Sequence, residues 1–251
     1  MKISVITVTY NSALVIDDCI KSVIKQSHNP VEHIVIDGDS KDDTIRILNK
    51  YQNHLTKLIS EPDNGIYDAM NKGIKMATGD IIGFLNSDDF YADNDVLSKV
   101  ANIFINNPSI DACYSDLIYV DQLTASKTVR YFKSSKFQPG LFSKGWCPPH
   151  PTFFVRKSVF ERYGNFNLDL KIASDVDLMI RFLEVHNIQC LYIPDIWVKM
   201  RMGGTTNKSL KNIFLQNQEI ILSLKKYNLP INKIDFFTNK IISRTKQFFK
   251  R

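Results

Sequence analysis

The chain has 251 residues, 44% of them hydrophobic and 23% charged, and carries a formal net charge of +6. This length suits one large domain, or one domain with a small extension, and the 10 Gly and 9 Pro exclude a fibrous or low-complexity protein. The positive charge is compatible with nucleic acid, a membrane surface or an anionic small molecule, and its location along the chain decides between them.

Strand and helix patterns alternate over the first 105 residues. Alternating β-branched runs predict strands, and apolar residues at helical spacing predict helices. The strands are expected at 2–9, 31–37, 55–61 and 80–86, and the helices at 14–24, 41–51 and 65–77. This alternation predicts an α/β fold with a mostly parallel central sheet flanked by helices.

After residue 110 the pattern becomes more mixed, and no internal repeat is present. Neighbouring strands are expected at 111–120 and 127–133, and an ordered loop or turn at the Pro-rich 146–151. Further along we expect a helix at 174–186 capped by Ser174, a short strand at 190–195, a flexible loop at 200–207 and a helix at 209–227.

The cysteines and the first residues bear on cellular location. The four cysteines, which are Cys19, Cys113, Cys147 and Cys190, are scattered without a CxxC pair. They predict reduced, packed thiols in a cytoplasmic protein. The opening "MKISVITVTYN" is too short and too β-branched for a signal peptide, and the lack of about 20 consecutive apolar residues predicts no transmembrane helix.

Polar clusters follow each of the first four predicted strands, at 9–11, 37–43, 61–65 and 86–89. One such cluster is more often a solvated turn, but four at successive strand ends favour a binding site. In open α/β sheets, ligands bind beyond the carboxyl ends of the strands. We therefore expect the functional site at this edge of the sheet.

Two adjacent carboxylates, Asp88 and Asp89, directly follow the last of these apolar runs. Such a pair is repulsive, and burial increases the repulsion. A divalent cation would balance it, because Mg²⁺ and Mn²⁺ prefer carboxylate oxygens and share their coordination shell with substrate phosphates. The chain contains neither GxxxxGK[ST] nor GxGxxG, which excludes a standard NTPase and a dinucleotide-binding oxidoreductase.

Four segments together resemble the family 2 glycosyltransferases that have the GT-A fold and build bacterial surface polysaccharides. These segments are "ISVITVTYNSALVIDDCIKSVIKQS", "VIDGDSKDDT", "SEPDNGIYDAMNKGIKMATGDIIGFLNSDD" and "ASDVDLMIRF". The resemblance covers residues 2 to about 205. It implies a GT-A catalytic domain at 1–205, with a nucleotide-sugar-binding half at 1–110 and an acceptor-side half at 111–205, followed by a helical extension at 206–251.

The same resemblance implies transfer of a sugar from a nucleotide diphospho-sugar to an acceptor hydroxyl, with inversion at the anomeric carbon. The implied acceptor is a glycan, lipid-linked in the synthesis of O-antigen, capsule or exopolysaccharide. The implied cofactor is Mn²⁺ or Mg²⁺. Asp89 would hold the metal that bridges the diphosphate, and Asp88 would contact the ribose or the metal shell.

The donor would be contacted by residues of the strand-end loops. Thr9, Tyr10, Asn11 and Asp37 match the loops around the nucleotide, and Asn71 with Gly73 matches an "NxG" position. Many family members carry an acid that reads the uracil edge where this chain has Gly38, and Asp39 is a candidate to replace it. Many also carry Arg where this chain has Met70, and Asn86 replaces a further acid before Asp88.

The acceptor side contains three further candidates. Asp175 aligns with the catalytic base, which must take the proton of the acceptor hydroxyl, and a helix N-terminus would hold its carboxylate ionised. Asp177, two positions on, faces another way, and the alternative for Ser174 and Asp175 is a purely structural helix cap. His150 would contact the acceptor or the diphosphate, or be structural, and Arg201 in the flexible loop would neutralise phosphate.

Two other classes of function remain as alternatives. A metal-dependent nucleotidyltransferase would also use a strand-end Asp pair, but normally has a Gly-rich basic loop after the first strand, which "TVTYNSALV" lacks. A non-catalytic protein could bind nucleotide sugars or nucleic acid. Nucleic-acid binding requires basic residues clustered with aromatics on one face, whereas here the basic excess lies near the C-terminus, so no nucleic-acid partner is expected.

The tail at 231–251 forms a basic amphipathic pattern. Ile234, Phe237, Ile241 and Phe248 share one helical face, with Phe236, Ile242 and Phe249 beside it. The six basic residues are Lys233, Lys240, Arg244, Lys246, Lys250 and Arg251, against the single acid Asp235. The tail is therefore expected either to lie in the interface of the cytoplasmic membrane, near a lipid-linked acceptor, or to pack on the domain or a second subunit.

Overall fold

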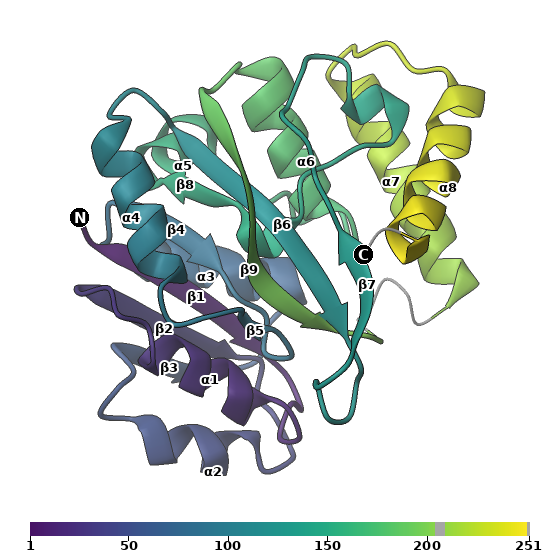
Figure 1. The fold of residues 1–251 in the computed structure, drawn as a ribbon. Helices are drawn as coiled ribbons and strands as arrows, with labels where there is room; N and C mark the ends of the chain where they lie inside the picture. Colours follow the sequence, from purple (N-terminus) through teal and green to yellow (C-terminus); the bar gives the residue numbers. More distant parts are fainter. Residues whose placement is uncertain (204–208, 250–251) are drawn as a thin grey trace.

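In the computed structural model, residues 1–203 and 209–249 are described, apart from the side chains of Leu210 and Phe249. Outside the described part lie residues 204–207, which belong to the predicted flexible loop, and Lys250 and Arg251 of the predicted tail helix. The described strands form one nine-stranded sheet in the order β3-β2-β1-β4-β8-β6-β9-β5, with β7 beside β6 (Figure 1). A single sheet therefore spans both predicted halves of the catalytic domain.

The first half of the sheet is parallel, as the alternating pattern predicts. Its strands are β1 (Ile3–Thr9), β2 (Val31–Asp37), β3 (Lys57–Ser60) and β4 (Ile81–Phe84). Strand β1 lies between β2 and β4, and β3 forms the edge. The carboxyl ends of the four strands therefore lie at one edge of the sheet.

The second half is mixed. It comprises β5 (Phe90–Tyr91), β6 (Ala112–Val120), β7 (Thr128–Phe132), β8 (Phe154–Arg156) and β9 (Cys190–Arg201). Strand β8 runs antiparallel to both β4 and β6, and so reverses the direction of the sheet. Strands β5 and β8 were not predicted, because two or three residues are too few to show an alternating period.

Strand β9 is longer than predicted, and this corrects two expectations. The predicted strand ended at residue 195 and a flexible loop was expected from 200, but β9 continues to Arg201. It pairs in parallel with the whole of β6, with register shifts near Ser115 and Asp116. Pairing with β6 extends the strand past Pro194, which local sequence signals cannot anticipate.

Helices cover both faces of the sheet. One face carries α1 (Ile16–Ile24), α2 (Thr44–Leu48) and α4 (Val96–Asn106), with the 3-10 turn Asn49–Tyr51 after α2. The other carries α3 (Ile66–Met76), α5 (Lys157–Tyr163), α6 (Ser174–Ile180), α7 (Leu210–Lys226) and α8 (Lys233–Phe249). The predicted helix at 174–186 becomes a π-helical turn after Ile180. Two short 3-10 turns, Phe142–Lys144 and His150–Thr152, complete the acceptor-side loop.

Alternate residues of β1 face the two hydrophobic clusters, as strand geometry requires. Ile3 and Val5 contact the cluster under α1 and α4, and Ile6 and Val8 contact the cluster under α3. A Cβ at Gly73 of α3 would lie 2.4 Å from Ile6 Cγ2, so only glycine permits this close approach. The first helix on that face is therefore held tightly against the parallel strands.

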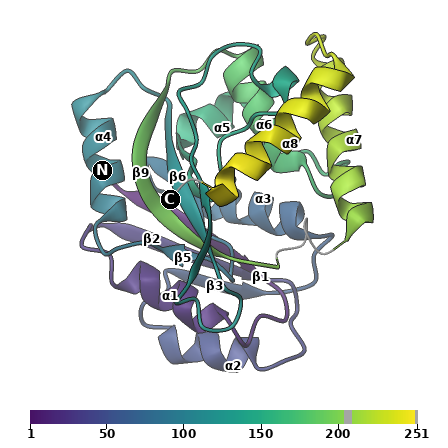
Figure 2. The same cartoon turned by 45° about the vertical axis from the view of Figure 1, so that its right-hand side comes forward.

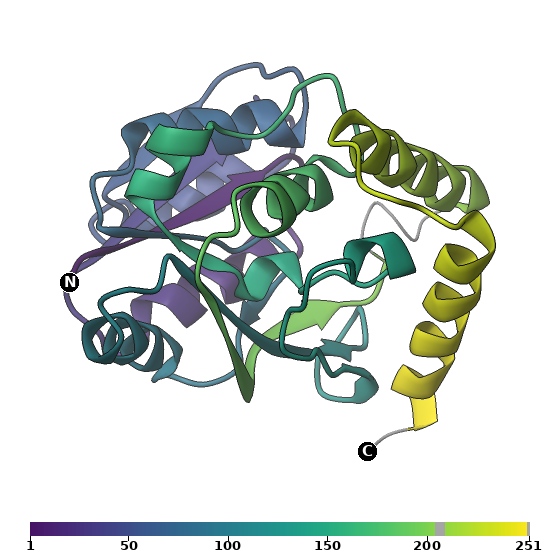
Figure 3. The ribbon, with the colours of Figure 1, turned by 90° about the horizontal axis from the view of Figure 1, so that it is seen from above.

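The two C-terminal helices belong to the same core. Ile220 and Leu224 of α7 and Phe236 of α8 are buried in the cluster under α3 and α6. Helix α8 runs beside β7 and the 3-10 turn at 142–144 (Figures 2 and 3). Among the described helices, none combines the length and apolarity needed to cross a bilayer.

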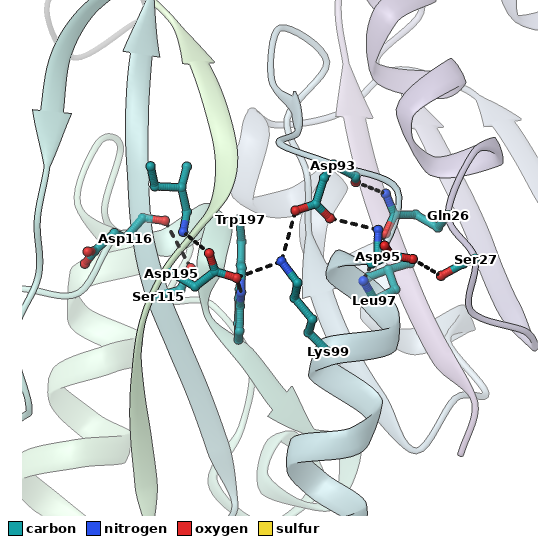
Figure 4. A network of polar contacts seen from close by, with 11 residues as sticks. Gln26, Ser27, Asp93, Asp95, Leu97, Lys99, Ser115, Asp116, Asp195 and Trp197 are labelled. Carbon is teal, nitrogen blue, oxygen red and sulfur yellow. Dashed lines mark hydrogen bonds and ion pairs between the residues drawn. The ribbon is translucent and has the colours of Figure 1, made fainter.

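A polar network ties α4 to β9 (Figure 4). Lys99 Nζ lies 2.9 Å from Asp93 and 2.8 Å from Asp195, and Asp195 also accepts a hydrogen bond from Trp197 Nε1 at 3.2 Å. Gln26 joins the same region by donating to the Asp93 carbonyl at 2.7 Å. Lys99 is engaged by both carboxylates, and each contact joins secondary-structure elements, so we interpret the network as structural.

Candidate active site

The loops after β1, β2 and β4 meet at the predicted edge of the sheet. Ser12 Oγ lies 2.9 Å from Ser87 Oγ, which joins the loop after β1 to the loop after β4. Asn11 donates its backbone N–H to Ser40 Oγ at 2.8 Å, and its Oδ1 accepts from the Lys41 N–H at 2.8 Å. Asn11 therefore joins the loops after β1 and β2, and its side-chain oxygen is engaged in doing so.

Asp37 is fully buried at the end of β2. Its carboxylate accepts from Ser40 N at 2.9 Å, Ser40 Oγ at 2.5 Å and Ser60 Oγ at 2.7 Å. Asp39 has a positive φ of 64° and pairs with Lys41 Nζ at 2.5 Å. Asp37 thus shapes the turn that carries Gly38, whereas the Asp39 side chain pairs with Lys41.

The absence of a side chain at Gly38 leaves space that the Asp63 carboxylate occupies. A Cβ at position 38 would lie 2.5 Å from Asp63 Oδ2 and 3.5 Å from Tyr10 Cδ2. Asp63 Oδ1 accepts from the Gly65 N–H at 2.8 Å, and the Tyr10 ring is 61% exposed. Nearby, Thr9 Oγ1 is buried without a hydrogen-bond partner. Asp63 was not among the predicted site residues, although it lies in the polar cluster at 61–65 and position 38 is a glycine.

Asp89 is fully buried after β4. Its Oδ2 accepts from Asn86 Nδ2 at 3.2 Å, whereas its Oδ1 has no hydrogen-bond partner. Burial, and then the charge of Asp88, raise the pKa of Asp89 well above its usual range. Asp88 itself is half-buried beside it. A buried carboxylate with an orphan oxygen costs free energy unless a cation or proton balances it.

The two carboxylates fit a divalent cation that takes its remaining ligands from elsewhere. Within residues 1–203 and 209–249, no three His, Cys, Asp or Glu side chains gather to hold a metal by themselves. Mg²⁺ in particular is usually bound by one or two carboxylates plus substrate phosphates and water. Asp89 and Asp88 are therefore the residues that would hold the metal, with a phosphate-bearing ligand completing its shell.

Arg201 supplies a positive charge next to this pair, from a position that sequence analysis did not anticipate. It lies at the end of β9 and is 5% exposed, so its predicted placement in a flexible loop is wrong. Its Nη1 donates to the Asp88 carbonyl at 3.1 Å, its Nη2 pairs with Asp18 of α1, and its guanidinium lies 5.1 Å from the centre of the Phe90 ring. These contacts hold the backbone of the Asp88–Asp89 turn.

Asp175 lies in the first turn of α6, half-buried. Its Oδ1 accepts from Tyr67 Oη at 3.0 Å. Burial, and then the carboxylate of Asp175, raise the pKa of Tyr67 well above its usual range, so Tyr67 stays a donor. Asp177 is fully buried and accepts from Tyr227 Oη at 3.3 Å. The two acids thus contact different partners, as their spacing predicts.

The start of α6 is not held by the predicted cap. The N-cap position is Ala173, and Ser174 Oγ instead donates to the Asn167 carbonyl at 2.8 Å. The free N–H groups before the helix are satisfied by Glu219 of α7, which accepts from Lys171, Ile172 and Ala173 at 2.8–2.9 Å. A carboxylate from a distant helix does what a local cap normally does, so sequence analysis could not find it.

His150 lies between two aromatic rings near Asp175. Its ring stacks on Phe84 at 5.3 Å and meets Phe166 edge-on at 5.7 Å, and its Nε2 is buried without a partner. Burial lowers the pKa of His150, opposed by the charge of Asp175. The imidazole is therefore neutral at neutral pH and presents an unsatisfied nitrogen at the junction of β4 and the acceptor-side loop.

Asn71 and Met70 on α3 have structural contacts. The Asn71 amide donates to the Phe166 carbonyl and accepts from the Phe166 N–H, both at 3.0 Å. Met70 is buried in the core. Both atoms of the Asn71 amide are thus engaged in holding the segment that carries Phe166 against Tyr67.

The sequence model of glycosyl transferase family 2 matches residues 4–164. The chain belongs to glycosyl transferase family 2. This confirms the resemblance, and the protein is a glycosyltransferase. A PGL/p-HBAD biosynthesis glycosyltransferase of Mycobacterium bovis is 30% identical over 217 residues, covering 85% of this chain and 82% of the relative. An uncharacterized glycosyltransferase of Mycobacterium tuberculosis is 33% identical over 183 residues, covering 71% and 68%.

Solved structures confirm the GT-A fold of this glycosyltransferase. S. aureus TarS 1–349 in complex with UDP-GlcNAc has a TM-score of 0.69 and 20% identity, covering 96% of this chain and 70% of that one. The mannosyltransferase PcManGT from Pyrobaculum calidifontis, in complex with GDP-Man and Mn²⁺, has a TM-score of 0.66 and 18% identity, covering 98% and 69%. The longer TarS chain is covered over 45% of its length.

Proposed function

We propose that this family 2 glycosyltransferase moves a sugar from a nucleotide diphospho-sugar to an acceptor hydroxyl, with inversion at the anomeric carbon. The observation that carries the proposal is the buried Asp89 with its orphan oxygen beside Asp88, at the strand edge where the donor-side loops meet. The donors in the UDP-GlcNAc and GDP-Man complexes of the two solved structures support this substrate class.

The donor side contributes binding groups. Asp89 and Asp88 hold Mn²⁺ or Mg²⁺, which when bound neutralises charge developing on the diphosphate leaving group. The exposed Tyr10 ring and the buried Thr9 hydroxyl contact the nucleoside, and Asp63, which fills the space over Gly38, reads the edge of the base. Arg201 holds the Asp88–Asp89 turn in place.

The acceptor side contributes the base. Asp175, in the first turn of α6, takes the proton from the attacking hydroxyl. Tyr67 and the Glu219-bound loop orient the carboxylate. A single attack by the acceptor hydroxyl, from the face opposite the leaving diphosphate, inverts the configuration at the anomeric carbon. Asp175 is the one carboxylate that this step requires as a base.

A panel of nucleotide sugars tests this function. We expect metal-dependent release of nucleoside diphosphate from one donor, and none in EDTA. Full activity in EDTA would remove the metal from the proposal, and pyrophosphate release from a nucleoside triphosphate would favour a nucleotidyltransferase. The same panel on Asp63→Asn, with Asp39→Asn as its matched control, tests base recognition: a changed nucleotide preference is expected for Asp63→Asn alone.

The exposed surface of α8 supports a lipid-linked glycan as the acceptor. The helix buries Phe236 against the domain but leaves an apolar stripe, with Ile234 75% and Ile241 65% exposed and Phe237 and Phe248 beside them. Lys233 and Lys246 are exposed on the same helix. An exposed apolar stripe among basic residues suits the interface of an anionic membrane. Such contact would bring the glycosyltransferase to the surface that holds the acceptor lipid.

Flotation with anionic liposomes tests this contact. We expect the full chain to float at low salt, and Ile234→Ser/Ile241→Ser to float at least several-fold less, because the change removes exposed apolar groups while keeping the buried Phe236. Ile105→Ser, an exposed isoleucine of α4 across the molecule from α8 (Figure 1), is the matched control and should float like the unchanged chain. Equal flotation of all three proteins would argue against the membrane role.

A further inference from the structure

Three basic residues lie together where β7 meets α8. Arg130 of β7 is buried, and its Nε donates to Gln247 Oε1 of α8 at 2.6 Å. Its guanidinium lies 4.6 Å from the centre of the Tyr119 ring. Arg244 lies on α8 one helical turn after Lys240 and three residues before Gln247. We call Arg130, Lys240 and Arg244 the α8 basic cluster.

Lys240 is the half-buried lysine of the cluster. Its Nζ donates to Asn217 Oδ1 of α7 at 2.6 Å, a neutral acceptor that does not balance the charge. Burial lowers the pKa of Lys240 to about 8; Cys147 and Asp175 oppose the shift, and Arg244 adds to it. Lys240 and Arg244 are also four residues apart on one helix, a spacing at which like charges destabilise.

The positive charges of the cluster are not neutralised by ion pairs among the described residues. Within the described part of the chain, none of its three members forms an ion pair. Bringing three cations together at buried and half-buried positions is costly, and a bound anion would offset that cost. Arg and Lys are the side chains that bind phosphate most effectively.

The position of the cluster indicates which substrate supplies the anion. A Cβ at Gly145 would lie 2.8 Å from the Phe236 carbonyl and 3.3 Å from Lys240 Cβ, so α8 lies against the loop that leads to His150. Lys240 thus lies beside the acceptor-side loop, whereas the nucleotide loops follow β1, β2, β3 and β4. The cluster therefore lies on the acceptor side of the proposed base.

We propose that the α8 basic cluster binds a phosphate or diphosphate group of the acceptor. The proposal rests on the proposed glycosyl transfer, and it narrows the acceptor to a phosphate-linked molecule. The exposed stripe of Ile234, Phe237 and Ile241 lies on the same helix, so a single helix would contact both the anionic and the lipid part of such an acceptor.

Calorimetric titration with geranyl diphosphate, and separately with UDP and Mn²⁺, tests the site. We expect Lys240→Gln and Arg244→Gln each to weaken geranyl diphosphate binding about tenfold or more, as loss of a charge-assisted hydrogen bond implies. Lys246→Gln, an exposed lysine of the same helix, is the matched control and should bind like the unchanged chain. UDP affinity should stay the same in every variant.

Undetectable binding of geranyl diphosphate to the unchanged chain would overturn the proposal, as would Gln variants that bind it as tightly as the unchanged chain. Loss of UDP affinity in those variants would also overturn it, because the cluster would then be assigned to the donor diphosphate. Geraniol serves as the uncharged probe, and equal affinity for it would show apolar binding alone. If Lys240→Gln fails to fold, the half-buried Arg244 provides the decisive variant. Failure of the proposed function is distinguishable, because UDP with Mn²⁺ would then not bind the unchanged chain.

Discussion

Asp175→Asn is expected to lower the turnover number by about 10²-fold or more while leaving the affinity for the nucleotide donor unchanged. Asn keeps the size of the side chain and can still accept from Tyr67 Oη, which now lies 3.0 Å from Asp175 Oδ1. It cannot take the proton of the attacking hydroxyl. Steady-state kinetics at saturating acceptor, together with calorimetric titration of the nucleotide, separates the two effects.

Asp177→Asn is the matched control, since Asp177 is fully buried two positions further along α6 and accepts from Tyr227. It should change stability more than turnover. If Asp177→Asn abolishes turnover and Asp175→Asn does not, the base is misassigned by two positions. Glu219→Gln gives an independent check on how Asp175 is positioned. A Gln side chain accepts hydrogen bonds from the three N–H groups before α6 less strongly, so turnover should fall while donor affinity stays the same.

Asp89→Asn is expected to stabilise the metal-free protein and to abolish its stabilisation by Mn²⁺. Burial and the neighbouring Asp88 raise the pKa of Asp89 in the folded state, so ionising it at neutral pH costs free energy. Removing that charge should raise the free energy of unfolding in EDTA by about 1–3 kcal/mol, the usual cost of an unsatisfied buried polar group.

The sign of the pH dependence follows from the same shift. Above the ordinary carboxyl pKa, the folded metal-free protein binds more protons at Asp89 than the unfolded chain does, so this contribution to stability falls as pH rises. The advantage of Asp89→Asn in EDTA should therefore be larger at pH 8 than at pH 5. Thermal unfolding at both values measures it, with the exposed Asp43→Asn as control. A variant that is less stable than the unchanged chain in EDTA, or still stabilised by Mn²⁺, would contradict the assignment.

Local sequence patterns were sufficient for the four parallel strands of the donor half, although they did not predict β5 or α4. The strands β1 to β4 and the helices between them follow from β-branched alternation and helical spacing, since both are periodic over a few residues. The polar clusters at their ends were also predictable, because parallel strands deliver successive loops to one edge of a sheet. The Asp88–Asp89 pair therefore appeared in the sequence as a candidate metal site, and the structure places it at that edge, with Asp89 buried and Asp88 half-buried.

The acceptor half depended on pairing that the local sequence does not encode. Strand β9 extends to Arg201 only because β6 pairs with its whole length, and Arg201 then reaches Asp18, 183 residues earlier in the chain. The same holds for Glu219, which satisfies the N–H groups before α6 from another helix.

By itself, then, the sequence determined the alternating donor half, the strand-end carboxylates and the amphipathic tail, because each rests on the spacing of neighbouring residues. Only the tertiary structure decided that Asp63 fills the space over Gly38, and that α8 buries Phe236 while leaving Ile234 and Ile241 exposed. Both outcomes depend on which distant surfaces come into contact. Helical spacing defines the faces of a helix, but the shape of its partner decides which face is buried.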